Sequence, residues 1–180
     1  MSLWGWITLG WAVFWIYWLI EAVRSKPGAG AGIRGRPVGT VIVIAGIILI
    51  PRLHLHGLNV HAPALRAIGV ALFVAGLALA IWARINIGRN WGMPMTTKAE
   101  PELVTSGPYA LVRHPIYSGI LLAFLGTALA TNISWLLALV LGGAYFIYSA
   151  TVEEKIMGTT FPDVYPSYRA RTKMLIPFLL

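Results

Sequence analysis

The chain has 180 residues, of which 58% are hydrophobic and 11% charged, and its mean hydropathy is +0.74. A soluble domain carries about a quarter charged residues, so the composition excludes a water-soluble globule and predicts an integral membrane protein. The formal net charge is +8, and the absence of cysteine excludes disulfides, thiolate nucleophiles and cysteine-based metal sites. In a membrane protein such a basic excess indicates a cytoplasmic face rather than nucleic-acid binding.

Five apolar stretches are long enough, or nearly so, to cross a bilayer, which takes about 20 residues. They cover residues 3–20, 38–50, 67–83, 116–130 and 133–152. The second and fourth are short and need little tilt, a thinned bilayer or shielding by neighbouring helices. The first lacks the basic start of a secretory signal, so we expect a retained helix.

The expected fold is therefore all-α: one integral membrane domain over residues 1–180, built as a bundle of five transmembrane helices with a cytoplasmic C-terminal cap. Residues 1–85 supply three spans, and residues 86–180 supply a core of two spans and a tail.

Basic residues are distributed unevenly over the segments between these stretches. Of the fourteen Lys and Arg residues, only Arg52 and Arg66 fall on the side of the second connection. The positive-inside rule then places the N-terminus outside and the C-terminus in the cytoplasm. The acidic residues lie on the cytoplasmic side as well, so the polar chemistry is expected at one face of a multi-pass membrane protein.

Two polar features of the first half have simple structural interpretations. Residues 30–35 match the dinucleotide-binding pattern G-x-G-x-x-G, but they lack the flanking βαβ unit, which favours a glycine-rich loop. His54, His56 and His61 have no carboxylate or cysteine nearby, which favours an interfacial loop over a weak metal site. No metal site is predicted.

Aromatic residues are concentrated in the first stretch. Trp11, Trp15 and Trp18 are spaced four and three residues apart, which puts them on one helix face. The spacing favours packing against lipid or another helix, with a wall for a lipophilic substrate as the alternative.

The most informative segment precedes the fourth stretch. Ser106 or Gly107 can cap a short helix with Pro108 at its first position. His114 and Tyr117 are three residues apart and so face the same side of the next helix entrance. A capped turn explains the prolines and glycines, but it does not explain why several polar side chains converge at a membrane boundary, which favours a functional site. These side chains are Tyr109, Arg113, His114 and Tyr117.

Two adjacent carboxylates, Glu153 and Glu154, end the fifth stretch at the hydrocarbon edge. Placing carboxylates there costs desolvation free energy unless cations pair with them. Arg113, Lys155 and the tail bases are the available cations, and a salt-bridged helix end is the simplest alternative to a functional role. The amphipathic tail that follows is expected to fold back against the membrane face as a cap.

Together these segments resemble the isoprenylcysteine carboxyl methyltransferase family. The resemblance covers roughly residues 87–177, about half of the chain. It rests on Gly88-x-Asn90-Trp91, Leu103-Val104-Thr105-x-Gly107-x-Tyr109, Arg113-His114-Pro115-x-Tyr117, Glu153-Glu154, and Phe161, Tyr165, Tyr168, Ile176 and Pro177 in the tail.

The resemblance implies a membrane-embedded methyltransferase that uses S-adenosyl-L-methionine without a Rossmann domain. Its cofactor would lie in a cytoplasmic pocket closed by the C-terminal segment, and a lipophilic or lipidated acceptor would enter from the bilayer. The partners implied are that acceptor and membrane lipids. The cofactor-binding positions carried over are Pro101, Glu102, Leu103, Val104, Tyr109, His114, Pro115, Ile116, Tyr117 and Glu153.

The candidate catalytic residues are Arg113, His114 and Glu154. A carboxylate acceptor is already ionised at neutral pH and needs no general base. A thiol or an amine acceptor needs one, and His114 and Glu154 are the candidates.

One departure from the family pattern concerns the acceptor. The family places an arginine for the acceptor's carboxylate four residues before the first motif glutamate, where this chain has Ser149. Arg84 or Arg113 could substitute, so the candidate substrate-binding residues are Ser149, Arg84 and Arg113. In the tail, Pro162 replaces a glycine and Met174 an arginine.

Several functions remain open at this point. The first is O-methylation of an isoprenylcysteine-type carboxylate, and phospholipid, amine or thiol methylation on the same core is the nearest alternative. An NADPH-dependent membrane reductase of the sterol type and a catalytically silent scaffold are less well supported by the motifs.

Overall fold

The computed structural model describes residues 1–23, 56–91 and 102–179, and over these ranges it contains helices and no strand. The α-helices are α1 (Leu3–Val23), α3 (Pro63–Ile87), α4 (Pro115–Ala130), α5 (Trp135–Thr160) and α6 (Tyr165–Arg171). Three short 3₁₀ helices are η2 (His56–Leu58), η3 (Gly88–Asn90) and η4 (Gly107–Ala110).

Helices α1, α3 and α5 are long and apolar enough to cross a membrane, and α4 is a shorter apolar helix. The predicted all-α membrane bundle is therefore confirmed, with four of the predicted spans matched by α1, α3, α4 and α5. The second predicted span at 38–50, the glycine-rich residues 30–35 and His54 lie outside the described residues. The division of the chain at residue 85 stays a prediction.

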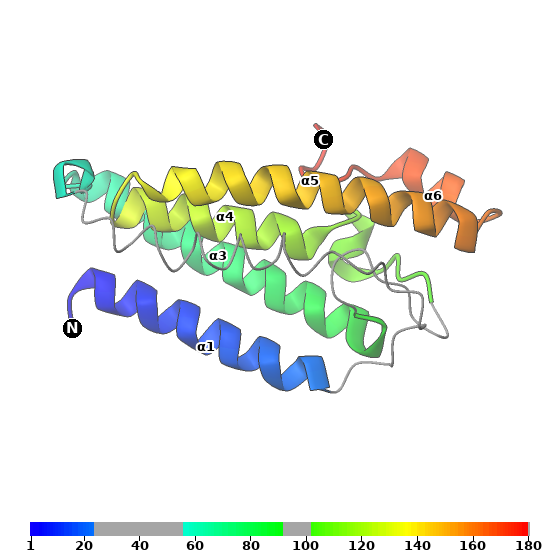
Figure 1. Cartoon of the computed structure of the whole chain (residues 1–180), viewed down its shortest axis with the longest axis horizontal. Helices are drawn as coiled ribbons and strands as arrows, with labels where there is room; N and C mark the ends of the chain where they lie inside the picture. Colours follow the sequence, from blue (N-terminus) through cyan, green and yellow to red (C-terminus); the bar gives the residue numbers. More distant parts are fainter. Residues whose placement is uncertain (24–55, 92–101, 180) are drawn as a thin grey trace.

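Helices α1, α3, α4 and α5 lie side by side with their axes roughly aligned (Figure 1). The N-terminus, η2 and the α4–α5 connection lie at one end, where Val60 N–H donates to the Thr131 carbonyl at 2.9 Å and Ile133 N–H donates to that of Leu58 at 3.0 Å. The opposite end gathers the last turns of α1, α3 and α5, the first turn of α4, and α6. We call this second end the polar end.

Helices α3 and α4 pack with their backbones in contact. A Cβ added to Gly76 would lie 2.5 Å from the backbone nitrogen of Ala123 and 2.6 Å from the carbonyl oxygen of Gly119. Gly126 faces the backbone of Phe73 with equally little space. Small residues let two membrane helices approach this closely, and close packing replaces the hydrophobic driving force that lipid removes.

Helix α1 joins this pair through aromatic side chains. The indole of Trp11 is buried, donates to the hydroxyl of Thr127 at 3.1 Å, and lies 5.3 Å from the ring of Phe124 between centroids. Trp18 meets the Trp91 ring edge-on at 5.5 Å. The tryptophan face of the first stretch therefore packs against other helices.

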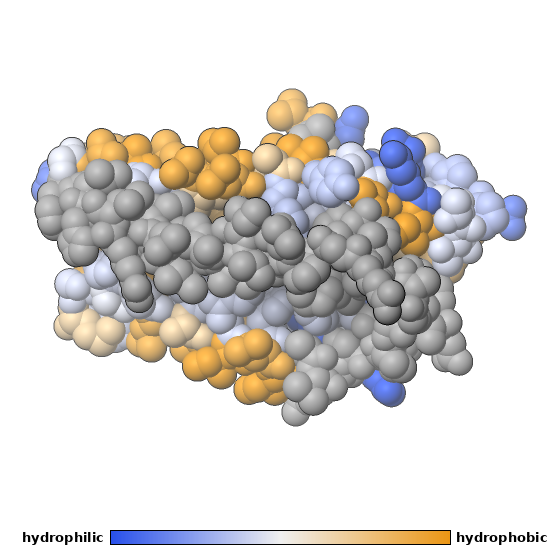
Figure 2. All heavy atoms as spheres, viewed as in Figure 1, coloured by the Kyte–Doolittle hydropathy of each residue, from blue (hydrophilic) through white to orange (hydrophobic). Residues whose placement is uncertain are grey.

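The outer surface of the bundle suits a lipid environment. Figure 2 shows hydrophobic side chains along its flanks and strongly hydrophilic ones mostly toward the end that carries α6. Val13, Val74 and Val140 are examples from three different helices, and each remains more than half exposed. Lipid chains can cover such side chains, whereas water cannot do so favourably.

Candidate active site

The turn before α4 is fixed in place by Gly107. This residue opens η4 with φ of +58°, in the left-handed region that favours glycine. A Cβ here would also collide with the side chain of Asn86. The close approach sets η4 against the end of α3 and leaves Tyr109 buried in the polar end.

Glu153 forms one half of the site. The hydroxyl of Tyr117 donates to Glu153 Oε1 at 2.5 Å, and His114 Nδ1 lies 3.4 Å from Glu153 Oε2. The rings of His114 and Tyr117 stack with 5.5 Å between centroids, and Tyr117 stacks on Phe146 at 4.5 Å. We call these three rings the aromatic ladder; it places flat faces directly beside a carboxylate.

Glu154 forms the other half and faces cations. Arg113 Nε donates to Glu154 Oε1 at 2.6 Å, and both side chains are almost fully buried. Arg169 Nε lies 3.4 Å from the second oxygen but is largely exposed. The two adjacent carboxylates thus differ, because Glu154 is paired with guanidinium groups and Glu153 faces the aromatic ladder.

His114 lies between the two carboxylates. Its Nε2 is 3.6 Å from Glu154 Oε1, is buried, and has no hydrogen-bond partner among the described residues. Burial alone would lower the pKa of His114, but the contact with Glu153 and the negative charges of Glu153 and Glu154 outweigh it and raise the pKa above its ordinary value of 6.5.

The chain beyond α6 folds back onto this site, as expected for the cap. The backbone N–H groups of Arg113 and His114 donate to the carbonyls of Lys173 and Met174 at 2.8 and 3.0 Å. The Arg113 guanidinium also donates to the carbonyl of Thr172, and Ser118 Oγ donates to that of Leu175 at 2.6 Å. Four successive tail residues are therefore bonded to the motif before α4 and to its first turn.

A second tail contact comes from α6. Tyr168 donates its hydroxyl to the carbonyl of Tyr109 at 2.7 Å. Burial raises the pKa of Tyr168 to about 12, so this hydroxyl remains a donor at physiological pH.

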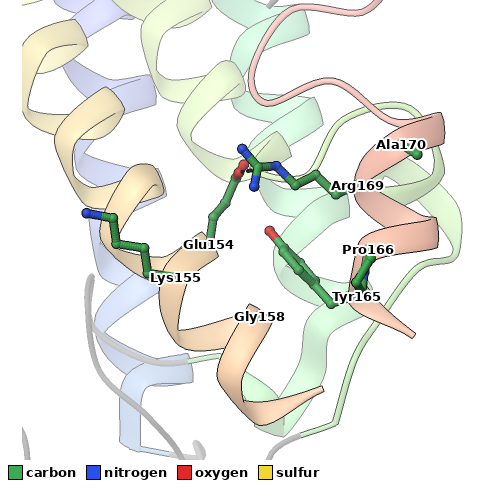
Figure 3. Close-up of a pocket in the computed structure, with 7 residues that line it drawn as sticks. All are labelled: Glu154, Lys155, Gly158, Tyr165, Pro166, Arg169 and Ala170. Atoms are coloured by element: carbon green, nitrogen blue, oxygen red, sulfur yellow. Dashed lines mark ion pairs between the residues drawn. The ribbon is translucent and has the colours of Figure 1, made fainter. Parts of the chain in front are cut away.

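A pocket of about 550 Å³ opens between α5 and α6. Figure 3 shows Glu154 and Arg169 meeting across the gap between these helices, with the hydroxyl of Tyr165 directed toward them. Its lining residues are Glu154, Lys155, Gly158, Tyr165, Pro166, Arg169 and Ala170.

The sequence motifs that carry the family resemblance do not include Arg169 or Ala170 of this pocket, or Phe146 of the aromatic ladder. The aromatic residue itself was visible in the sequence, but its proximity to Tyr117 depends on how α4 and α5 pack.

The predicted cofactor positions fall into two groups. The structure brings His114, Tyr117 and Glu153 together, and Pro115 and Ile116 are buried in the same first turn of α4. The upstream positions stand apart in the chain: Pro101 lies outside the described residues, Leu103 and Val104 are half-buried, and Glu102 is exposed and accepts a hydrogen bond from Asn90.

The predicted substrate residues already contact protein groups. Ser149 is fully buried one turn before Glu153 and donates to the Tyr145 carbonyl at 2.9 Å. Arg84 is buried, donates to the carbonyls of Glu21 and Gly88 at 2.7 Å each, and lies 4.9 Å over the Trp91 ring. Arg84 thus joins the ends of α1 and α3, and the roles of Ser149, Arg84 and Arg113 toward a substrate stay predictions.

The polar end of this helical membrane bundle gathers two adjacent carboxylates, Arg113, His114 and stacked rings, which agrees with the membrane-embedded methyltransferase that the motif resemblance implies. The chain belongs to the phospholipid methyltransferase family, whose model matches residues 65–164. That match covers all but the first two residues of α3, the whole of α4 and α5, and thus all residues of the aromatic ladder.

The relatives that the chain matches include methyltransferases for different acceptors. It is 32% identical over 128 residues to a methanethiol S-methyltransferase of Pseudomonas sp. (strain GM41(2012)), covering 66% of this chain and 49% of that protein. It is 33% identical over 101 residues to a protein-S-isoprenylcysteine O-methyltransferase of Schizosaccharomyces pombe, covering 54% and 43%. It is also 31% identical over 113 residues to the cobalt-zinc-cadmium resistance protein CzcN of Cupriavidus metallidurans, covering 61% and 50%.

The chain spans about half the length of the curated relatives it matches. The resemblance to isoprenylcysteine methyltransferases drawn from the motifs is confirmed by these matches.

Proposed function

We propose that this protein transfers a methyl group from S-adenosyl-L-methionine to a lipophilic acceptor at the polar end of the bundle, on the cytoplasmic side of the membrane. The observation that carries the proposal is the Glu153 carboxylate held by Tyr117 beside the aromatic ladder. The family match and the methyltransferase relatives support the same reaction class.

The residues at the polar end fit such a cofactor. Glu153 offers a negative charge for an α-ammonium group, and charge-assisted hydrogen bonds of this kind are among the stronger ones in proteins. His114 and Tyr117 are already stacked within the aromatic ladder, so an adenine would pack against the outside of this ladder. When bound, S-adenosyl-L-methionine supplies an electrophilic methyl group on a cationic sulfonium. Tyr109, Pro115, Ile116 and residues 101–104 would complete its surroundings.

The protein's contribution to methyl transfer is alignment and exclusion of water. An in-line displacement needs the acceptor about 3 Å from the methyl carbon and opposite the leaving sulfur. The stacked rings and the bonded tail supply rigid walls for such an arrangement. Arg113 and Arg169 neutralise Glu154, so this carboxylate adds little net charge to the surrounding apolar environment.

The identity of the acceptor determines whether a base is needed. A carboxylate of the isoprenylcysteine type reacts as the ionised group. A thiol or an amine must lose a proton. The candidate general base that takes this proton is Nε2 of neutral His114, with Glu154 as the alternative. Because the pKa of His114 is raised, its neutral form becomes abundant only at higher pH.

Thiol S-methylation is the second candidate, and Ser149 favours it. Position 149 offers a short hydroxyl that already donates to the Tyr145 carbonyl, and it brings no positive charge for a carboxylate. A relative is named for S-methylation of methanethiol, a small uncharged thiol acceptor. An uncharged lipophilic thiol therefore suits this face of α5 better than a carboxylate does.

Cofactor binding is the primary test. Calorimetry of the purified chain with S-adenosylhomocysteine and with NADPH should give heat with the first ligand alone. Glu153→Gln should weaken binding roughly ten- to a hundredfold, because one charge-assisted hydrogen bond contributes about 1.5–3 kcal/mol. Asp163→Asn makes the same acid-to-amide change on the exposed turn before α6 and should bind normally. Absence of binding, or equal affinity of Glu153→Gln and the wild type, would contradict the proposal.

The acceptor is tested separately by turnover of a farnesylated cysteine carboxylate and of a neutral lipophilic thiol. If Ser149 marks a changed preference, the wild type favours the thiol, and Ser149→Arg raises carboxylate turnover at least about tenfold. Because Ser149 is fully buried, the folding of the Ser149→Arg variant is compared with that of Ser149→Ala. The alanine variant should keep the wild-type preference for the thiol. Efficient wild-type turnover of the prenylcysteine would instead show that a residue other than Ser149 binds the carboxylate of the acceptor.

A further inference from the structure

The segment that starts at the last residue of α6 exposes basic and then apolar side chains in sequence order. Arg171 and Lys173 are exposed, and Ile176, Phe178 and Leu179 follow with 48%, 94% and 77% of their surfaces accessible. Exposed apolar side chains next to charged ones mark interaction surfaces, because water alone would leave them unfavourably solvated. We call residues 171–179 the tail segment.

The tail segment is aligned with the bundle as an interfacial anchor would be. Figure 1 shows it leaving α6 and turning back along α5, so that the C-terminus lies nearer to the middle of the bundle than α6 does. Figure 2 shows hydrophobic atoms at this place, next to strongly hydrophilic ones on the side of α6. Along the bundle axis, the basic side chains of the tail segment thus lie nearer to the polar end, and its apolar side chains lie nearer to the middle of the bundle.

The chain from the end of α5 onward is predominantly positive. Residues 155–180 contain four basic residues and a single acid, Asp163. Arg169 is engaged with Glu154, whereas Arg171 and Lys173 are exposed, with the Arg171 guanidinium 5.9 Å from the centroid of the Tyr168 ring. A surface with this charge attracts anionic lipid headgroups.

We propose that the tail segment is an anchor for anionic phospholipids of the protein's own bilayer. Arg171 and Lys173 bind lipid phosphates at headgroup depth, and Phe178 and Leu179 enter the hydrocarbon edge, as in other interfacial elements that combine basic and apolar side chains. Lipid binding acts on the site through the backbone, because Lys173 and Met174 accept the hydrogen bonds from the N–H groups of Arg113 and His114.

The absence of native cysteine makes the anchor directly testable. Leu179→Cys carrying a nitroxide label is placed in nanodiscs of phosphatidylcholine alone or with phosphatidylglycerol. Accessibility to oxygen and to a water-soluble nickel chelate reports the depth of the label. Hydrogen exchange at the amides of Arg113 and His114, measured on the unlabelled chain, reports docking of the tail. We expect a lipid-embedded label and slower exchange when phosphatidylglycerol is present.

The basic side chains should account for that difference. Each Lys or Arg near an anionic surface contributes roughly fivefold, so Arg171→Ala/Lys173→Ala should speed exchange in phosphatidylglycerol discs by an order of magnitude or more. The same variant should change little in phosphatidylcholine discs. Arg66→Ala removes an exposed charge at the other end of α3 and should behave as the wild type in both.

Three results would overturn the anchor: a label that stays in water in both discs, exchange in the double variant equal to that of the wild type, or slowing by inorganic phosphate in phosphatidylcholine discs equal to that by phosphatidylglycerol. The last would indicate a free-anion site. None of these measurements needs turnover, so they are independent of the proposed methyl transfer.

Discussion

Arg113 Nε lies 2.6 Å from Oε1 of Glu154, and the two side chains are only 9% and 5% exposed. The same guanidinium donates to the carbonyl of Thr172 in the tail. One arginine before α4 therefore joins the end of α5 to the C-terminal segment. Breaking such a pair is costly because Glu154 stays buried, and among the described residues only His114 and the largely exposed Arg169 are left to offset its charge.

We predict that Arg113→Met lowers the free energy of unfolding by about 3–5 kcal/mol, since it leaves Glu154 buried next to a lost partner. Adding Glu154→Gln in the same chain should recover part of the loss. Denaturant unfolding in detergent measures the effect. Arg169→Met is the matched control, because its side chain is 63% exposed and an exposed pair contributes only about 0–1 kcal/mol. Equal losses in the two single variants would contradict a special role for Arg113.

The pH dependence of stability should carry the signature of His114. Because its pKa is raised in the folded protein, its contribution to stability is complete below 6.5, its ordinary pKa, and is lost as the pH rises through the folded value. The free energy of unfolding should therefore fall as the pH is raised above about 6.5. His114→Gln should flatten this slope, whereas His61→Gln, at an exposed histidine, should preserve it. A slope unchanged in His114→Gln would assign the dependence to another group.

Close packing of α3 on α4 gives a prediction about stability alone. Gly76→Ala should lower the free energy of unfolding by about 1–3 kcal/mol, because the new methyl group meets the backbone of Ala123 and Gly119 rather than a movable side chain. Gly158→Ala on α5 is the control, since a Cβ at this position would have no neighbouring atom within 4 Å. There alanine should stabilise the helix by about 0.5–1 kcal/mol. Thermal unfolding of both variants distinguishes the two outcomes, and a stable Gly76→Ala protein would show that the helices can separate without loss.

The sequence predicts the existence of the helices better than their ends. Hydropathy places the third span at residues 67–83 and the fifth at 133–152, whereas α3 is Pro63–Ile87 and α5 is Trp135–Thr160. Hydropathy reports where a chain leaves the hydrocarbon, but a helix continues until a residue stops it. Gly88, at φ of +53°, ends α3, and Pro162 follows the end of α5.

The candidate site is predictable only where its residues are neighbours in the chain. The spacing of His114 and Tyr117 places them on one side of a helix start, and the ring stacking agrees with this. The pairing of Arg113 with Thr172 joins residues 59 positions apart, and it depends on how the tail returns. For Arg84 a positive charge near the membrane edge suggested an anion anchor, but the carbonyl of Glu21 reaches it only through the packing of α1.

The orientation of the bundle in the membrane gives a final prediction. The N-terminus before α1 and η2, which begins at His56, lie at one end of the bundle (Figure 1). Thr159 is in the last turn of α5 at the polar end, where the carbonyl of Lys173 accepts from Arg113. The concentration of basic residues at the polar end predicts that this end faces the cytoplasm. In cells that express single-cysteine variants, a membrane-impermeant maleimide should label positions 2 and 56 from outside, and positions 159 and 173 only after lysis. The unsubstituted chain, which has no cysteine, is the blank. Labelling of positions 159 and 173 in intact cells would reverse the orientation and place the proposed cofactor site outside the cytoplasm, where S-adenosyl-L-methionine could not be supplied from the cytoplasmic pool.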